Sequence, residues 1–139
     1  MTEINFYVGK SDTLRDRLLL ACRLAQKAYD KGLHIHIHTD SLATSQRLDE
    51  LLWTWHPSSF MPHALADTAS EERITIAHDY EPTDNCDYLI NISNMKPDFF
   101  SRFVKMGEII DQSPDILTDG RKRYAYYRER GYTLSYHQL

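Results

Sequence analysis

Short apolar runs alternate along this chain with longer stretches in which apolar residues recur every three or four positions. The short runs predict β-strands over residues 4–8, 33–38, 73–78, 88–92 and 108–111, with a final extended segment at 132–136. Helices are predicted from Leu14 to Gly32, from Asp40 or Ser41 to Pro57, from Pro97 to Gly107 and from Ser113 to Gly131. Strands that alternate with helices imply βαβ units, a largely parallel sheet and helices on both of its faces.

Two of these helices and the segment 56–72 have unusual features. The helix after Pro97 is expected to bury four apolar side chains, those of Phe99, Phe100, Phe103 and Val104. Gly120 is expected to weaken the middle of the last helix, so that this helix is split or starts late. Residues 56–72 show no periodicity, and long segments of this kind are often functional.

The composition is that of an ordinary globular protein. Of 139 residues, 42% are hydrophobic and 26% are charged, so a single α/β domain over residues 1–139 is expected. The formal net charge of -4 argues against a protein whose main task is to bind nucleic acid. No signal pattern opens the chain and no apolar run is long enough for a bilayer, so we expect a cytoplasmic protein that does not bind membranes.

No residue pattern predicts catalysis or a cofactor. Cys22 belongs to the apolar face of the first helix, and Cys86 has acidic neighbours that raise the pKa of a thiol. The chain contains no G-x-S-x-G, no H-E-x-x-H and no convincing pair of catalytic carboxylates. We therefore expect a protein that is not an enzyme.

Two patterns have weak functional interpretations. Gly9-Lys10-Ser11, between the first strand and helix, resembles the end of a phosphate-binding loop, but Ile4 stands where such a loop requires its first glycine. A capped turn is therefore the favoured interpretation. His34, His36 and His38 alternate along the second strand and share a face, which indicates an edge strand or a partly solvated surface more than a zinc site.

The basic and aromatic stretch 121–131 has the clearest binding pattern. Arg121, Tyr124 and Arg128 are three and four residues apart, so they form one stripe on a helix. Two guanidiniums beside an aromatic ring suit a carboxylate on an apolar group, and phosphate would also fit. The alternative is a solvated helix end, since cations are favoured near a helix C-terminus before a glycine such as Gly131.

A second candidate surface lies at the end of the second helix and in the loop after it. Trp53 and Phe60 belong to a stretch of large apolar residues that cannot all reach the core. Exposed patches of this kind commonly bind partner proteins. The equally weighted alternative is that both side chains fill a satellite core under the sheet.

The chain resembles the chi-subunit family of bacterial DNA polymerase III, nearly from end to end. The resemblance is carried by Phe6-Tyr7, Arg47-Leu48-Asp49-Glu50-Leu51-Leu52-Trp53, Ser59-Phe60-Met61-Pro62-His63, the run from Arg121 to Arg128, and Gly131-Tyr132. It implies a Rossmann-like three-layer sandwich without a glycine-rich phosphate loop and without catalysis. It also implies a role as an accessory subunit of the clamp-loader complex during DNA replication.

The resemblance further implies two protein partners. One is the psi subunit, bound at the positions of Trp53 and Phe60. The other is the acidic C-terminal tail of single-stranded-DNA-binding protein, which ends in a phenylalanine carboxylate. Its site corresponds to Ile110, Arg121, Tyr124 and Arg128. The family pattern has a lysine where this chain has Ala125, and Lys122 or Arg123 is expected to supply charge from the flank.

Two other functions compete with this adaptor role. One is a small nucleotide- or phosphate-binding α/β protein that uses the Gly9-Lys10-Ser11 turn. The other is direct binding of single-stranded DNA by the basic and aromatic helix, since Tyr and Arg can stack on bases. The net negative charge disfavours the second, and no specific nucleic-acid binding is expected.

Overall fold

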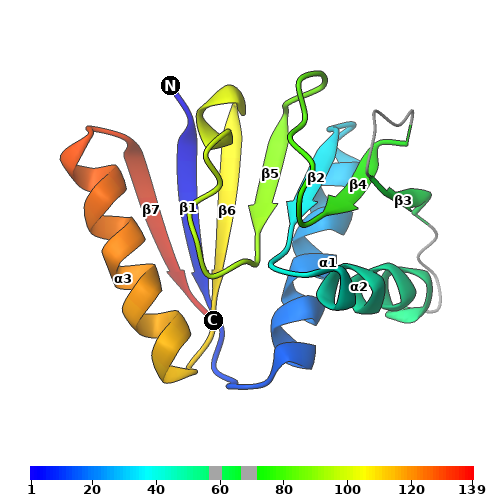
Figure 1. The fold of residues 1–139 in the computed structure, drawn as a ribbon, viewed down its shortest axis with the longest axis horizontal. Helices are drawn as coiled ribbons and strands as arrows, with labels where there is room; N and C mark the ends of the chain where they lie inside the picture. Colours follow the sequence, from blue (N-terminus) through cyan, green and yellow to red (C-terminus); the bar gives the residue numbers. More distant parts are fainter. Residues whose placement is uncertain (57–60, 67–71) are drawn as a thin grey trace.

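The computed structural model describes residues 1–56, 61–66 and 72–139, and it contains one seven-stranded sheet. The strands are β1 (Glu3–Val8), β2 (Ile35–His38), β3 (His63–Leu65), β4 (Ile74–Ala77), β5 (Tyr88–Asn91), β6 (Lys105–Ile110) and β7 (Thr133–Gln138). They follow the order β3-β4-β2-β5-β6-β1-β7, and every pairing is parallel (Figure 1). The prediction of an α/β fold with a largely parallel sheet is therefore confirmed.

Three α-helices connect the strands, and their ends follow the expected chemistry. They are α1 (Leu14–Asp30), α2 (Leu42–Thr54) and α3 (Pro114–Glu129). The side chains of Thr13 and Ser41 cap the first two helices by accepting hydrogen bonds from backbone N–H groups of the first turn. Gly32 and Gly131 follow α1 and α3 with φ of 83° and 79°, a region that glycine enters without strain.

Two apolar cores lie on the two faces of the sheet. On one face, α1 and α2 pack against the sheet, and Leu18, Leu48 and Ile37 are representative of this core. On the other face, α3 and the segment 99–103 pack against β1, β5 and β6, around residues such as Phe6 and Tyr127. Alternation of side chains along each strand supplies both cores.

The prediction of a helix from Pro97 to Gly107 is wrong. Only a single 3-10 turn forms there, over Phe100–Arg102, and β6 follows almost at once. The three phenylalanines are buried as expected, but Val104 is 70% exposed. Gly107 is not a helix end: it lies within β6, where an added Cβ would come within 2.7 Å of the Tyr88 hydroxyl. This glycine makes room for a cross-strand ring rather than ending an element.

Strand β2 is not the predicted edge strand, because it lies between β4 and β5. His36 is buried, its Nδ1 lies 2.6 Å from the Thr75 hydroxyl, and the rings of Tyr80 and Phe99 pack against it. Burial lowers the pKa of His36 to about 3, so the imidazole is neutral at pH 7. Aromatic rings, not solvent, therefore cover part of this histidine face. The three-residue strand β3, in the segment without periodicity, was not predicted.

Candidate functional site

A buried carboxylate fixes α3 to the sheet. Glu108 of β6 is 0% exposed, and its Oε2 accepts hydrogen bonds from Arg123 Nε at 3.0 Å and from the Tyr127 hydroxyl at 2.7 Å. Its Oε1 accepts a hydrogen bond from Asn91 Nδ2 at 2.8 Å. Burial and the charge of Glu108 raise the pKa of Tyr127, so the phenol keeps its proton and donates. Arg123 and Tyr127, one helical turn apart, thereby set the rotation of α3.

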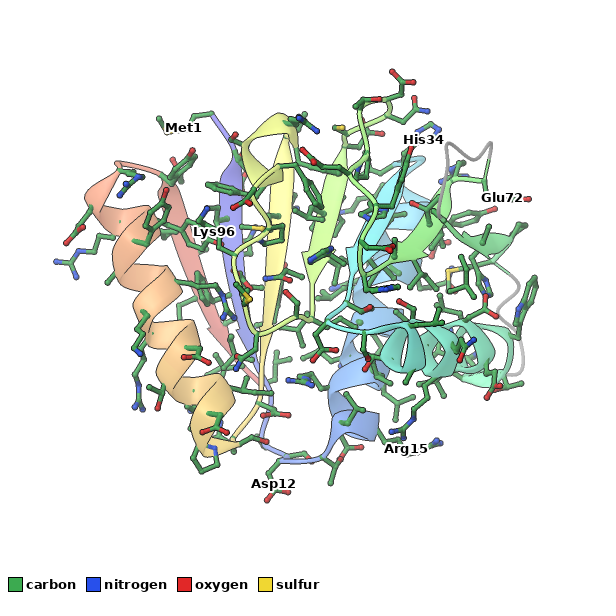
Figure 2. All side chains as sticks on the ribbon, viewed as in Figure 1. Met1, Asp12, Arg15, His34, Glu72 and Lys96 are labelled. Carbon is green, nitrogen blue, oxygen red and sulfur yellow. The ribbon has the colours of Figure 1, made fainter. Side chains whose placement is uncertain are left out.

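This rotation places the predicted stripe on the flank of α3. Because Arg123 and Tyr127 face the sheet, residues 121, 124 and 128 lie to one side of the buried face. Tyr124 is half-buried, and the centroid of its ring lies 5.2 Å from that of Phe6 in an edge-on contact. Arg121 and Arg128 are exposed. Lys96, labelled in Figure 2, reaches α3 from the segment between β5 and β6, with its Nζ 5.0 Å from the centre of the Tyr126 ring.

Gly120 does not split α3, which is continuous from Pro114 to Glu129, so that expectation is wrong. The glycine instead permits a close approach to the sheet. An added Cβ at Gly120 would lie 2.7 Å from Cδ1 of Ile110, whose side chain occupies the space below the helix. Contact with β6 therefore compensates for the low helix propensity of glycine at this position.

A pocket of about 290 Å³ lies beside this contact, between α3 and the sheet. Its lining consists of Phe6, Val8, Ile110, Leu117, Gly120, Arg121, Tyr124 and Tyr136. The structure thus brings together three of the four residues predicted for a tail site, namely Ile110, Arg121 and Tyr124. Tyr136 of β7 was not predicted. Its place opposite α3 depends on the pairing of β7 with β1, which residue spacing does not reveal.

Arg128 borders a neighbouring cavity of about 380 Å³, together with Tyr124, Ala125 and Glu129. Tyr124 lines both cavities, so the pocket that contains Arg121 and the cavity that contains Arg128 adjoin at this side chain. In the described parts of the chain, no carboxylate oxygen lies within 4.0 Å of either guanidinium. Both cations are therefore available to an anionic partner.

Of the two residues expected to add charge from the flank, only one is placed to do so. Arg123 is buried and bound to Glu108, so its predicted contribution is wrong. Lys122 is exposed, and its Nζ lies 4.0 Å from Asp119, at the limit of an ion pair. Surface pairs of this kind are weak, so Lys122 keeps the freedom to approach a ligand.

The second predicted surface is only partly described. Trp53 is 45% exposed at the end of α2, and its ring lies 4.1 Å, centroid to centroid, from the buried ring of His63. Phe60 lies outside the described residues. The two residues were predicted as a pair, and only Trp53 can be placed, at the edge of the sheet formed by β3.

The turn at Gly9 and the two cysteines have structural explanations. Gly9 N donates a hydrogen bond to Ile110 O, so the turn after β1 is tied to the end of β6. Burial raises the pKa of Cys22 to about 12 and also raises that of Cys86, so neither thiol is activated. Within residues 1–56, 61–66 and 72–139, no three His, Cys, Asp or Glu side chains are grouped to hold a metal ion. No helix in these residues is long and apolar enough to cross a membrane.

Comparison with known proteins identifies the family. The family model described as DNA polymerase III chi subunit, HolC, matches residues 1–135. The chain belongs to the DNA polymerase III chi-subunit family. This assignment supports a role as an accessory subunit in DNA replication.

Curated relatives carry the same name. The DNA polymerase III subunit chi of Pseudomonas aeruginosa is 34% identical over 139 residues, which are 100% of this chain and 98% of the relative. The chi subunit of Haemophilus influenzae is 30% identical over 119 residues, covering 84% of this chain and 83% of its own. That of Escherichia coli is 28% identical over 142 aligned residues, covering 97% of both chains. The sequence similarity to chi subunits thus covers the residues that form the α3 pocket, apart from Tyr136 in the family-model match.

Proposed function

We propose that this chi-family chain is a non-catalytic adaptor in the cytoplasm that links the clamp-loader complex to single-stranded-DNA-binding protein. It would bind a psi subunit at one edge of its sheet and the acidic C-terminal tail of single-stranded-DNA-binding protein at the other. The observation that carries the proposal is the pocket between α3 and β7. It combines apolar walls with an exposed guanidinium at Arg121 and a second one nearby at Arg128.

Each pocket residue has a distinct role in this proposal. The terminal phenylalanine ring of the tail enters the pocket and packs on Ile110 and Tyr124. Arg121 binds the terminal carboxylate, or a tail aspartate, through its planar fork of donors. Arg128 attracts the acidic residues that precede the ring, because opposite charges raise the rate of encounter.

The proposed psi surface centres on Trp53. This side chain is 45% exposed at the end of α2, and Trp is enriched among residues that dominate binding energies. Phe60 is its proposed second contact. Trp53→Ala should weaken psi binding at least tenfold, measured by calorimetry with purified psi, and leave tail binding unchanged. Unchanged psi affinity would contradict this part of the proposal.

A fluorescent peptide titration tests the tail site. The peptide carries the acidic tail and ends in Phe, and the control peptide lacks that Phe. We expect binding that requires the Phe and weakens as salt rises from about 50 to 200 mM, because screening reduces the attraction between charges.

Arg121→Ala should weaken binding of the peptide by about tenfold or more, the effect of losing a charge-assisted hydrogen bond of about 1.5 kcal/mol. Lys27→Ala is the matched control: it removes an exposed cation on α1 that does not line the pocket, and its effect should be within about twofold. Equal affinities of the Arg121→Ala variant and the unmodified chain would refute the tail assignment.

A further inference from the structure

A separate crevice opens at the carboxyl ends of β1 and β6. The helices that follow these neighbouring strands lie on opposite faces of the sheet, α1 on one and α3 on the other (Figure 1). Open α/β sheets bind their ligands at such positions. The volume of the crevice is about 510 Å³, which is typical of small-molecule sites. It lies alongside α1 and shares only Ile110 with the α3 pocket.

Arg17 of α1 lines this crevice, and its largely buried side chain is not fully hydrogen-bonded. Its side chain is only 10% exposed, and its Nε has no hydrogen-bond partner among the described residues. The nearest carboxylate oxygen, Asp111 Oδ2, is 3.8 Å away, which is too far for a hydrogen bond. A buried Nε–H group without a hydrogen bond is costly, and an anion in the crevice would satisfy it.

Gly9 also lines the crevice, and neither its backbone conformation nor its packing requires a glycine. Its φ is not positive, so its backbone conformation does not require glycine. An added Cβ would lie 3.8 Å from Ile110 O and 3.9 Å from Leu20 Cδ2, which are ordinary contacts, so packing does not require glycine either. The missing side chain instead leaves room at the wall of the crevice, next to Lys10.

The lining defines the class of ligand. Lys10, Arg17 and Arg23 favour an anionic group, whereas Asp16 and Asp111 disfavour a highly charged one. Apolar residues, among them Leu20, Ile110 and Trp55, supply surface for an uncharged ring. We propose that the crevice binds a nucleoside monophosphate, with its phosphate at Arg17 and its base against the apolar wall. No cradle of glycine backbone donors is present to hold a triphosphate.

The test uses the full chain and AMP as the probe, with adenosine and inorganic phosphate as separate arms. We expect AMP to shift the amide resonances of Gly9 to Ser11 in a heteronuclear NMR titration. At ten times its Kd it should raise the Tm by roughly 3–6 °C. Adenosine and phosphate should bind at least tenfold more weakly, because each makes only part of the contacts.

Two variants locate the site. Arg17→Met should weaken the binding of AMP at least tenfold. Gly9→Val should weaken it equally, because the added side chain fills the crevice while Arg17 stays in place. Arg15→Met is the matched control, because Arg15, labelled in Figure 2, is on the same helix but does not line the crevice. All three variants should keep their affinity for the tail peptide, so this test is independent of the proposed adaptor function.

The proposal is overturned if AMP causes no resonance shift up to about 10 mM, a concentration well above Kd values of typical metabolite sites. It is equally overturned if both Arg17→Met and Gly9→Val bind AMP like the unmodified chain. Equal affinities for inorganic phosphate and AMP would exclude a nucleotide as the ligand.

Discussion

The two edges of the sheet hold their exposed functional side chains in different ways. At the β7 edge, the buried carboxylate of Glu108 binds Arg123 and Tyr127 and fixes the whole of α3. At the β3 edge, the buried imidazole of His63 supports the end of α2: its Nε2 lies 2.9 Å from Asp49 O, and its Nδ1 lies 2.7 Å from Met61 O. An ion-pair network thus supports one proposed partner site, and a single bridging side chain supports the other.

The two proposed partner sites therefore differ in how strongly they are coupled to the core of the sheet. Glu108 is on a central strand, so any change there affects the sheet and α3 together. His63 is on the outermost strand, which has three residues, so a change there should remain local. We therefore expect a substitution at Glu108 to destabilise the whole protein, and a substitution at His63 to disturb only the β3 edge.

The largest effect is expected from Glu108→Gln. This change leaves the charge of Arg123 buried without a counter-ion, which costs about 3 kcal/mol in the free energy of unfolding. Urea denaturation at pH 7 measures it. Arg123→Met in the same chain should restore part of the loss, because it removes the unpaired charge. A loss below about 1 kcal/mol for Glu108→Gln would show that the network does not anchor α3.

Acid should produce the next effect, at strand β2 between the two edges. Burial lowers the folded-state pKa of His36 to about 3, whereas the unfolded chain has the ordinary value of 6.5. Below pH 6.5 the unfolded state therefore binds a proton that the folded state does not bind. Stability should fall as pH falls from 6.5 toward 3, by about 2 kcal/mol at pH 5 for this group. His36→Gln should remove that share of the pH dependence, and an unchanged profile would contradict the assignment to His36.

His63→Gln should have a smaller and more local effect. An amide side chain cannot replace both imidazole contacts, and we expect a loss of about 1–2 kcal/mol in the free energy of unfolding. Trp53 fluorescence should change, because its ring rests on His63. The Kd for the tail peptide should stay within twofold. A large loss of tail binding would mean that the two edges are coupled.

The smallest effect is expected from Ala125→Lys, which supplies the lysine that the family resemblance implies at this position. Ala125 lines the cavity beside Arg128, so a lysine there adds one exposed cation next to the proposed path of the acidic tail. Tail affinity should rise about two- to threefold at low salt, and the gain should vanish at high salt. Peptide titration at two salt concentrations measures it, and a gain that is independent of salt would refute the electrostatic explanation.

Residue spacing predicted the parts of the molecule that depend on local chemistry. The periodicity of α1 was predicted correctly, and of the two predicted caps of α2, Asp40 or Ser41, Ser41 is the one that forms. The residues of the predicted stripe lie on one helix, α3. Each of these features is decided within a few neighbouring residues. Among the site residues, Arg121 and Tyr124 were predicted together for the same reason. Ile110 was added only by the family resemblance, and the structure places it in the same pocket.

The errors occurred where distant residues decide the outcome. Gly120 was expected to weaken a helix, but Ile110 on β6 explains why a glycine is accommodated there. The histidines of β2 were expected on an edge strand or a partly solvated surface. The strand is not at an edge, and Phe99 and Tyr80, far along the chain, cover part of the histidine face, whereas His34 and His38 stay partly exposed. Tyr136 and the Glu108 network were missed because their partners are defined by strand order. No periodicity within one segment contains that information.

Strand β1 pairs with β6 and β7, which lie at the far end of the chain. During synthesis, the first strand must therefore wait for residues 105–110 to leave the ribosome before it gains β6, and for residues 133–138 before it gains β7. At a typical rate of roughly 5–20 residues per second, this delay is of the order of ten seconds. The pocket between α3 and β7 is therefore incomplete until β7 has joined the sheet, so under the proposed function a chain whose β7 has not yet paired should not bind the tail peptide.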